Sequence, residues 1–421
     1  MDAVICKRQL AGYERRMRVI DWIITGRGQE LVLRRILFVN ILILLTFAGV
    51  FYWSDKKREV ESAMAGKGPA DIPAEPAGSK SVQENNGTGT PDAAEEKSGT
   101  EEETPEKDYI HWVDFGVSKF ALAEAYEYDR DTYGTNVHIG WVDLLAYTAA
   151  HTGGVFDNDQ TVCSHMERMK ERVSQGESIE KITEGLEYFP YYQEAYGAVL
   201  GGMVGEYEIE VPEEDGGRKI WEKRYGLKAF SPIAKGFPYT DYDDFGASRS
   251  YGYKRNHLGH DMLGQIGTPV IAVESGYVEA LGWNQYGGWR IGIRSFDKKR
   301  YYYYAHLRQG FPYQPELKEG SVVLAGDVIG YMGHTGYSTT EDVNNIQETH
   351  LHFGMQLIFD ESQKDGNNEI WIDCYQLVNF LYRNQSEAVR DDATKEWHRI
   401  YQMKDPSAGA YERTVDYSMY P

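Results

Sequence analysis

The chain is poor in cysteine and in basic residues, and each shortage excludes a class of protein. Only three of its 421 residues are cysteine, namely Cys6, Cys163 and Cys374. They fall in different predicted regions, so the sequence does not indicate a disulfide framework. None of them lies in the histidine-bearing segment described below, which argues against a cysteine nucleophile. The 44 Lys and Arg are outnumbered by 65 Asp and Glu, giving a net charge of −21, and this balance argues against a nucleic-acid partner.

A long uncharged segment near the start of the chain, Ile36–Trp53, predicts a membrane anchor. As a helix it would extend about 27 Å, enough to cross the hydrocarbon core of a bilayer. Residues 1–35 carry eight Lys and Arg against four acids, so we predict a basic cytoplasmic tail with the rest of the chain outside. A signal peptide cleaved near Ala63–Ala65 is the alternative. The charged stretch Asp55–Glu61 and the long leader favour an uncleaved, single-pass anchor.

Residues 54–108 predict a disordered acidic linker. Glu, Gly, Pro, Ala, Ser and Thr dominate this segment, and large hydrophobic side chains are almost absent. Such a segment cannot bury enough surface to offset the entropy cost of ordering it. A flexible chain of this length spans roughly 40 Å on average, so it would hold the domains that follow at a distance from the membrane.

Hydrophobic residues recur every three or four positions between residues 109 and 211, which predicts a small all-α domain. The expected helices are Phe120–Tyr128, Val137–Thr152, Thr161–Val173 and Ile179–Glu206. No motif selects one glutamate here as the acid of a glycan-cleaving enzyme. We therefore interpret the region as a domain packed beside the catalytic one, with a surface available to protein partners.

From Tyr251 onward the hydrophobic period changes to two, which is typical of strands. The expected strands are Pro269–Val273, Tyr277–Leu281, Trp289–Arg294, Arg300–His306 and Leu351–Ile358. Many short strands separated by glycine turns predict an antiparallel all-β domain, which we place at residues 225–383. Alternation along Tyr301–Tyr304 allows only two of these tyrosines to face a cleft. A helix is expected over Ile370–Arg383, and residues 384–421 are expected to form a polar tail on the surface.

Three histidine motifs in this β-rich region carry the chemistry. His350 and His352 point the same way if they lie on a strand, His257 precedes Asp261 by four residues, and His306 ends an aromatic strand. Two His and one Asp form a three-ligand zinc set with one position open for water, as in catalytic zinc sites. Two further His then remain for proton transfer. Five suitable residues within one segment of a chain with only 11 histidines are hard to attribute to chance.

In their order along the chain, these motifs resemble those of the lysostaphin-type (LytM-domain) zinc endopeptidases over about residues 240–360. The matching residues are Phe245–Arg249, His257, Gly259, Asp261, Gly267–Val270, Tyr304, His306, Leu307, the glycine-punctuated run Gly320–Gly336, and His350–Phe353. The resemblance implies that His257, Asp261 and His352 bind zinc (Zn2+) and that His306 and His350 form the catalytic pair. It also implies peptides of bacterial peptidoglycan as the substrate.

Two positions depart from the family pattern. The loop Thr339–Thr349 is longer than usual, and Gly354 stands where a glutamate commonly follows the last motif. Neither position is an implied ligand, so both bear on substrate preference. His260 is expected to face away from the metal because it adjoins Asp261, and His334 is expected on a loop near the cleft.

The sequence therefore predicts a multi-domain zinc metalloendopeptidase of the bacterial cell wall, held outside the cytoplasmic membrane by one transmembrane helix. It leaves open which of His306 and His350 is the general base, and a competing assignment makes His350 a ligand and frees His352. The alternative function is a non-catalytic, membrane-anchored LytM-type scaffold or activator of other cell-wall or sporulation proteins. Such proteins usually lack part of the ligand set, whereas this chain keeps all five positions.

Overall fold

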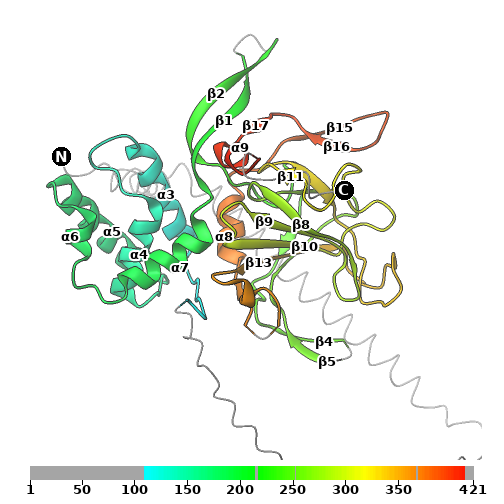
Figure 1. The fold of residues 1–421 in the computed structure, drawn as a ribbon, viewed down its shortest axis with the longest axis horizontal. Helices are drawn as coiled ribbons and strands as arrows, with labels where there is room; N and C mark the ends of the chain where they lie inside the picture. Colours follow the sequence, from blue (N-terminus) through cyan, green and yellow to red (C-terminus); the bar gives the residue numbers. More distant parts are fainter. Residues whose placement is uncertain (1–108, 214–216, 252, 367, 413–421) are drawn as a thin grey trace, which may run out of the picture. The chain divides into compact units, whose positions relative to one another are not determined.

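The computed structural model describes residues 109–412, apart from 214–216, 252 and 367 (Figure 1). All of the described residues belong to one compact unit. The predicted tail at residues 1–35, anchor at 36–53 and linker at 54–108 lie outside this part of the chain. Within it, the structure contains no helix with both the length and the hydrophobicity needed to cross a membrane.

The region expected to be helical begins as predicted. Its helices are α3 (Lys119–Thr132), α4 (Trp141–Thr152), α5 (Asp159–Ser174), α6 (Ile179–Thr183) and α7 (Phe189–Leu200). The side chains of Ser118 and Asn158 cap α3 and α5, because each accepts a hydrogen bond from a backbone N–H of the first turn.

The single helix expected over Ile179–Glu206 is wrong. The chain turns at Gly185, whose φ of 81° is the left-handed conformation that glycine favours. It resumes with Pro190 in the first turn of α7, where a missing backbone donor costs little. By Val204 the chain is already in a strand.

The rest of the described chain is built on an antiparallel sheet with the strand order β11-β8-β9-β10-β13-β6-β3, and β14 pairs with β13. This confirms the predicted antiparallel β domain. The strands are β3 (Thr240–Asp241), β6 (His260–Leu263), β8 (Gly276–Asn284), β9 (Gly288–Ser295), β10 (Arg300–Ala305), β11 (Val322–Val323), β13 (His350–Leu357) and β14 (Ile370–Ile372). Separate two-stranded ladders join β4 (Ser248–Tyr251) to β5 (Tyr253–Asn256), β7 (Pro269–Ile271) to β12 (Val328–Tyr331), and β15 (Ala388–Arg390) to β16 (Trp397–Arg399).

The helix expected over Ile370–Arg383 is also corrected. Its first residues form β14, and only Tyr375–Leu381 are helical, as α8. A one-turn 3-10 helix, η1 (Glu361–Gln363), precedes β14. Pairing with β13 explains the change, because Trp371 lies directly opposite Gln356 in that ladder.

The helices and the sheet share one hydrophobic core rather than forming separate cores. Tyr126 of α3 packs edge-to-face on Phe380 of α8, with ring centroids 5.8 Å apart. Arg300 of β10, fully buried, donates a 2.6 Å hydrogen bond to the carbonyl of Ala198 in α7. Because that guanidinium also pairs with Glu274, its charge is neutralised where helix and sheet meet.

A long hairpin made of β1 (Val204–Pro212) and β2 (Lys219–Leu227) projects from this body at the top of Figure 1. Its β1 edge pairs with β17 (Met403–Lys404), after which α9 (Pro406–Glu412) follows. The polar tail expected on the surface is therefore partly wrong. Met403 is buried, and Asp405 forms a buried 2.8 Å ion pair with Lys228. A buried lysine requires such a partner.

Candidate metal centre and active site

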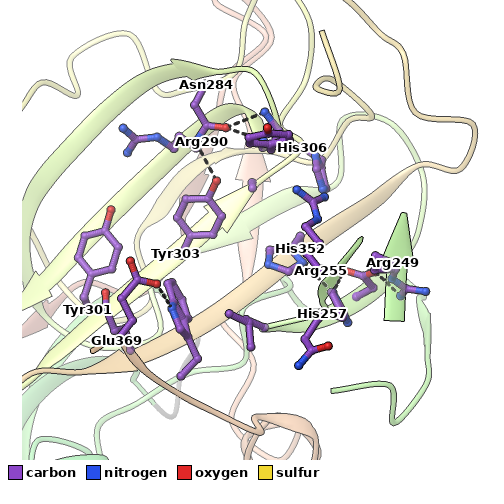
Figure 2. A pocket seen from close by; sticks show the side chains of 18 of the residues that line it. Arg249, Arg255, His257, Asn284, Arg290, Tyr301, Tyr303, His306, His352 and Glu369 are labelled. Carbon is purple, nitrogen blue, oxygen red and sulfur yellow. Dashed lines mark hydrogen bonds and ion pairs between the residues drawn. The ribbon is translucent and has the colours of Figure 1, made fainter. Parts of the chain in front are cut away.

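Strand pairing brings the five candidate residues to one groove. Figure 2 shows His257, His306 and His352 there. In the antiparallel ladder of β6 and β13, Asp261 lies directly opposite His352. On the other side of β13, Ala305 of β10 is opposite the same histidine, and His306 follows it in sequence. His257 lies between β5 and β6 and reaches Asp261 from the loop side. Motifs about ninety residues apart therefore meet across three neighbouring strands.

Three potential ligand atoms converge on one point. Nε2 of His257 lies 3.0 Å from Oδ1 of Asp261 and 3.0 Å from Nδ1 of His352, and the last two atoms are 2.9 Å apart. These three residues form a group that could hold a metal ion. Tetrahedral zinc with bonds of about 2.0–2.2 Å separates its ligand atoms by roughly 3.3–3.5 Å. A small outward shift would fit these donors to zinc, and two nitrogens with one carboxylate oxygen is a typical zinc donor set.

The charges of this group suit a cation. Burial would raise the pKa of Asp261, but hydrogen bonds with His257 and His352 hold that pKa well below its usual range. Burial lowers the pKa of His352, so its ring is neutral and keeps a lone pair. Burial also acts to lower the pKa of His257, yet its contacts with Asp261 and Asp244 raise it overall. Binding of a metal would therefore compete with a proton at His257.

Two residues that the sequence reasoning did not single out support the ligands. Nδ1 of His257 hydrogen-bonds to the backbone carbonyl of Asp244 at 3.3 Å and lies 3.2 Å from its carboxylate Oδ1. This contact keeps the hydrogen on Nδ1 and leaves Nε2 free for a metal. Arg249 pairs with both Asp244 and Asp261, at 3.3 Å from Oδ2 of Asp261. Of these two residues, only Arg249 is indicated by the sequence, because it lies in the segment Phe245–Arg249 that matches the family pattern.

Gly259 of the His-x-Gly-x-Asp motif is required because the ring of His352 lies close to its backbone. A Cβ atom at this position would lie 2.5 Å from Cε1 and 2.6 Å from Nε2 of His352, and 2.9 Å from the carbonyl oxygen of Phe353. Any side chain would therefore push His352 away from Asp261. The glycine is fixed by packing against a ligand and not by its backbone conformation.

The two remaining histidines have a defined arrangement of hydrogens. Nδ1 of His306 lies 2.9 Å from the carbonyl oxygen of Thr335, and Nδ1 of His350 lies 2.8 Å from that of Glu348. A carbonyl oxygen only accepts, so each Nδ1 carries a hydrogen, and in the neutral form of either ring the lone pair is on Nε2. The two rings are 4.7 Å apart, and Nε2 of His350 is 3.8 Å from Oδ1 of Asp261. Both lone pairs thus belong to atoms beside the metal group.

The backbone of His306 is in the left-handed region, with φ of 60°. This conformation costs a non-glycine residue on the order of 1–3 kcal/mol. Two backbone hydrogen bonds hold it, from His306 N–H to the carbonyl of Gly287 and from Gly333 N–H to the carbonyl of His306. Regular alternation along β10 would point residue 306 into the core beside Tyr304, so the strained backbone re-aims this side chain into the groove.

His260 and His334 stand outside the group. His260 faces away from the ligand atoms, as predicted. It is buried, and its Nε2 lies 3.0 Å from Oδ2 of Asp241. His334 lies on a loop, as predicted, where its Nδ1 donates to the carbonyl of Ile346 at 2.7 Å. Each histidine has a structural partner.

The candidate site lies in a groove with a volume of about 710 Å³ across the face of the sheet. Tyr301 and Tyr303 line it, whereas Tyr302 and Tyr304 are fully buried in the core, which confirms the alternation predicted for these four residues. The groove extends from the metal group toward Glu369 (Figure 2). Trp371 of β14, beyond β13, also lines it. A substrate that reaches the histidines can therefore also contact side chains far along the sheet.

Residues 255–367 match the model of Peptidase family M23. The chain is 41% identical over 119 residues to the L-Ala--D-Glu endopeptidase of Bacillus subtilis, an alignment that covers 28% of this chain and 35% of the relative. It is 40% identical over 98 residues to lysostaphin of Staphylococcus simulans, covering 23% of this chain and 17% of the relative. The chain thus spans well under two thirds of the length of these curated relatives.

One of the solved structures similar to this chain belongs to lysostaphin. The catalytic domain of the antimicrobial peptidase lysostaphin from Staphylococcus simulans is 31% identical, and the match covers 34% of this chain and 92% of that domain. The TM-score is 0.27, which is too low for a comparison of the two folds. The match to the family model, at residues 255–367, includes the three candidate ligands and the two further histidines.

Proposed function

We propose that this chain, which belongs to peptidase family M23, is a zinc-dependent endopeptidase that hydrolyses peptide bonds of bacterial peptidoglycan. One observation carries the proposal: three donor atoms of His257, Asp261 and His352 converge within about 3 Å beside two histidines whose Nε2 atoms carry lone pairs. A structural zinc site would be closed by a fourth protein ligand, whereas a three-residue set leaves a position for chemistry.

His257 through Nε2, Asp261 through Oδ1 and His352 through Nδ1 would hold the zinc. When bound, zinc supplies a Lewis acid that polarises a carbonyl group and lowers the pKa of water. Asp244 and Arg249 keep His257 and Asp261 in place, because each contacts the side of the ligand that faces away from the metal group.

The proton transfers fall to His306 and His350. Amide hydrolysis needs a base that accepts a proton from the attacking water and an acid that returns one to the leaving nitrogen. Each Nε2 can accept a proton, because each Nδ1–H is already bound to a backbone carbonyl. Burial, together with the neighbouring His350 and His352, lowers the pKa of His306 well below its usual range, so its ring is neutral at neutral pH.

Tyr303 is placed to orient the substrate beside these groups. Its Oη accepts a 3.1 Å hydrogen bond from Nδ2 of Asn284. Among the residues that the structure describes, none accepts a hydrogen bond from the Tyr303 hydroxyl, and the Tyr303 ring lies 5.9 Å from that of His352. This hydroxyl can therefore donate to a carbonyl oxygen of a peptide lying in the groove.

The test of the proposal is release of peptides from purified cell walls. Full-length protein, purified in detergent and loaded with zinc, is expected to release soluble fragments with new amino termini, measured by amine labelling and mass spectrometry. Addition of a chelator should stop the release, and returned zinc should restore it. Stoichiometric zinc without any release would instead favour the non-catalytic scaffold.

We further propose that residues 36–53 anchor the protein in the cytoplasmic membrane with the catalytic domain outside. The support is the basic leader followed by an uninterrupted hydrophobic run. Protease added to intact spheroplasts is expected to digest the C-terminal portion while a tag at residue 1 stays protected. A protected C-terminal portion, or a mature protein that begins near Gly66, would contradict this topology.

A further inference from the structure

A guanidinium without a carboxylate partner lies in the same groove as the candidate metal group. Arg255 of β5 lines this groove (Figure 2). Its Cζ lies 5.0 Å from the centre of the Tyr286 ring and 5.1 Å from that of the Tyr337 ring, and its Nη2 donates a 2.6 Å hydrogen bond to the Tyr337 hydroxyl. Among the residues that the structure describes, none places a carboxylate within 4.0 Å of this guanidinium. Aromatic rings therefore hold the cation, and its charge is not neutralised.

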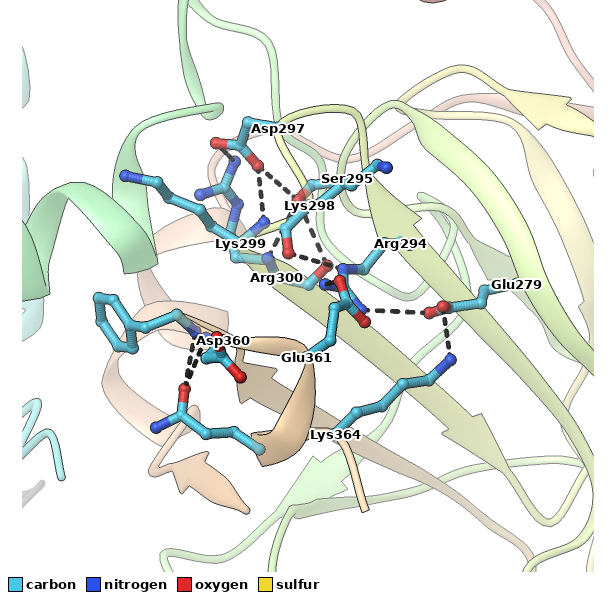
Figure 3. A network of polar contacts seen from close by, with 12 residues as sticks. Glu279, Arg294, Ser295, Asp297, Lys298, Lys299, Arg300, Asp360, Glu361 and Lys364 are labelled. Atoms are coloured by element: carbon cyan, nitrogen blue, oxygen red, sulfur yellow. Dashed lines mark hydrogen bonds and ion pairs between the residues drawn. The ribbon is translucent and has the colours of Figure 1, made fainter. Parts of the chain in front are cut away.

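Other arginines of the same domain are paired with acidic side chains, as Figure 3 shows. Buried Arg294 pairs with Glu361 at 2.8 Å, and buried Arg300 pairs with Asp297 at 2.8 Å. These pairs neutralise charge inside the protein, where an unpaired cation would be costly. Arg255 is only partly buried, so water can solvate its charge until an anionic ligand takes that place.

Arg255 lies close to the groups that would carry out hydrolysis. It precedes the candidate ligand His257 by two residues. The ring of Tyr337, its hydrogen-bond partner, lies 6.0 Å from the ring of His306. A ligand group bound by Arg255 would therefore adjoin the part of the peptide that reaches His306, rather than the far end of the groove.

The loop that departs from the family pattern, Thr339–Thr349, holds Tyr337 in this place. The backbone of Tyr337 is left-handed, with φ of 48°, and its carbonyl accepts a 2.7 Å hydrogen bond from Nδ2 of Asn345. The loop is itself fixed by Asp342, whose Oδ1 accepts a 2.8 Å hydrogen bond from Nε1 of Trp289. The position of the guanidinium is therefore set before any ligand binds, which lowers the entropy cost of binding.

A second arginine of the groove projects from the same face of the sheet as the candidate ligand His352. In the antiparallel ladders of β9, β10 and β13, Ile291 is opposite Tyr304, so that Arg290 falls in the row of Ala305 and His352. Residues in one row lie on the same face of a sheet, and these three all line the groove. Among the described residues, no acidic side chain pairs with Arg290 either.

The charges of both arginines reach Tyr303. Burial raises the pKa of Tyr303 overall, whereas the hydrogen bond from Asn284 and the positive charges of Arg290 and Arg255 act to lower it. Because both charges that act on this hydroxyl are positive, the groove around it favours a negatively charged group of a ligand.

We propose that Arg255, held against Tyr286 and Tyr337, binds a free carboxylate of the substrate peptide beside the bond that is hydrolysed. Tyr337 alone among the described residues accepts a hydrogen bond from this guanidinium, so the other donors of its planar fork can contact the two carboxylate oxygens. Arg290 adds to the positive charge around that carboxylate without needing to contact it. This inference rests on the proposed function, because it names the peptide chemistry that the same groove selects.

The experiment compares three alanyl-γ-glutamyl-lysine peptides with acetylated amines. The reference peptide has both its glutamate carboxylate and its C-terminal carboxylate amidated, the second has only the glutamate carboxylate free, and the third has only the C-terminal carboxylate free. Binding is measured by calorimetry to the full-length, zinc-loaded His350→Ala variant, which is expected to bind peptide with little turnover. At least one charged peptide should bind at least about 10-fold more tightly than the reference, as expected for a hydrogen bond between charged groups. That peptide identifies the carboxylate that is recognised.

Substitutions then assign the carboxylate to Arg255. In the same background, Arg255→Gln should reduce the affinity for that charged peptide to the affinity for the reference, and should leave the affinity for the reference unchanged. Arg308→Gln is the matched control and should keep the preference, because Cζ of Arg308 also lies over a tyrosine ring, 4.3 Å from the centre of Tyr331, but outside the groove. Should Arg255→Gln not fold, Arg255→Lys, which keeps the charge without the planar fork, should lower the preference several-fold.

Equal binding of the three peptides by the His350→Ala variant, or no binding of any, would overturn the subsite. A preference that survives Arg255→Gln, or is undiminished in Arg255→Lys, would do the same, because the carboxylate would then be held elsewhere, for example at the zinc. Release of peptides from cell walls by the wild-type protein, measured in parallel, reports separately on the proposed function. Release without any preference for a charged peptide would contradict the subsite alone.

Discussion

Replacing His257 or Asp261 by alanine is expected to remove zinc and hydrolysis together. The remaining two ligands cannot hold the ion firmly, because a three-residue set has no protein donor to spare. In Asp261→Ala the charge that balances the ion is also lost, and two histidines that now contact that carboxylate at 2.9–3.0 Å would face each other. Elemental analysis of the full-length protein should give one zinc per wild-type chain and almost none in either variant. Peptide release from cell walls should fall to the level of a blank.

Matched control variants distinguish the loss of zinc and hydrolysis from general misfolding of the protein. Asp392→Ala and His398→Ala remove the same kinds of side chain from exposed positions outside the groove, and both should keep zinc and activity. Circular dichroism checks that every variant is folded. Wild-type protein without stoichiometric metal after careful preparation would contradict the enzyme proposal, as would an Asp261→Ala variant with normal activity.

Replacing His306 or His350 is expected to lower activity without removing zinc, unlike replacement of a ligand. His306→Ala and His350→Ala are each expected to keep zinc but to lower kcat by about 10²–10⁴-fold, the usual contribution of general acid–base catalysis. The reason is geometric: each ring presents Nε2 to the groove while its Nδ1 is held by a backbone carbonyl. Zinc content and initial rates of peptide release are measured on the same preparations.

The competing assignment of the His350–His352 pair gives the opposite result. If His350 were the ligand, His350→Ala would lose zinc and His352→Ala would keep it. The structure supports His352 as ligand, because its Nδ1 is 2.9 Å from Oδ1 of Asp261 whereas Nε2 of His350 is 3.8 Å from the same atom. Zinc content of the two single variants therefore decides between the assignments without any activity measurement.

Local sequence pattern predicted those features that depend on one element alone. Alternation along a strand placed His350 and His352 on one face, and it limited the tyrosines of Tyr301–Tyr304 in the groove to two, which the structure identifies as Tyr301 and Tyr303. The failures occurred where pairing with distant segments overrode local pattern. Ile370–Ile372 became a strand because β13 offered it a partner, and the polar residue Asp405 became buried because Lys228 needed a counter-charge.

The roles of Asp244 and Arg249 in supporting the site could not be predicted from the sequence, although Arg249 belongs to the matching segment Phe245–Arg249. Asp244 stands in a short acidic run with no spacing that marks it, and Arg249 is separated from Asp261 by a complete hairpin strand. Their roles depend on contacts between side chains from separate segments.

By itself, the sequence determined the set of chemical groups: two histidines and an aspartate suited to zinc, two further histidines, and strands whose alternation fixes which side chains share a face. Tertiary structure decided how these groups meet. Which strands become neighbours depends on long-range backbone pairing, and that pairing sets Asp261 opposite His352. Tertiary structure also decided the orientation of the His306 side chain. Strand alternation would bury this residue. A left-handed backbone, held by hydrogen bonds to Gly287 and Gly333, turns its ring toward the metal group instead.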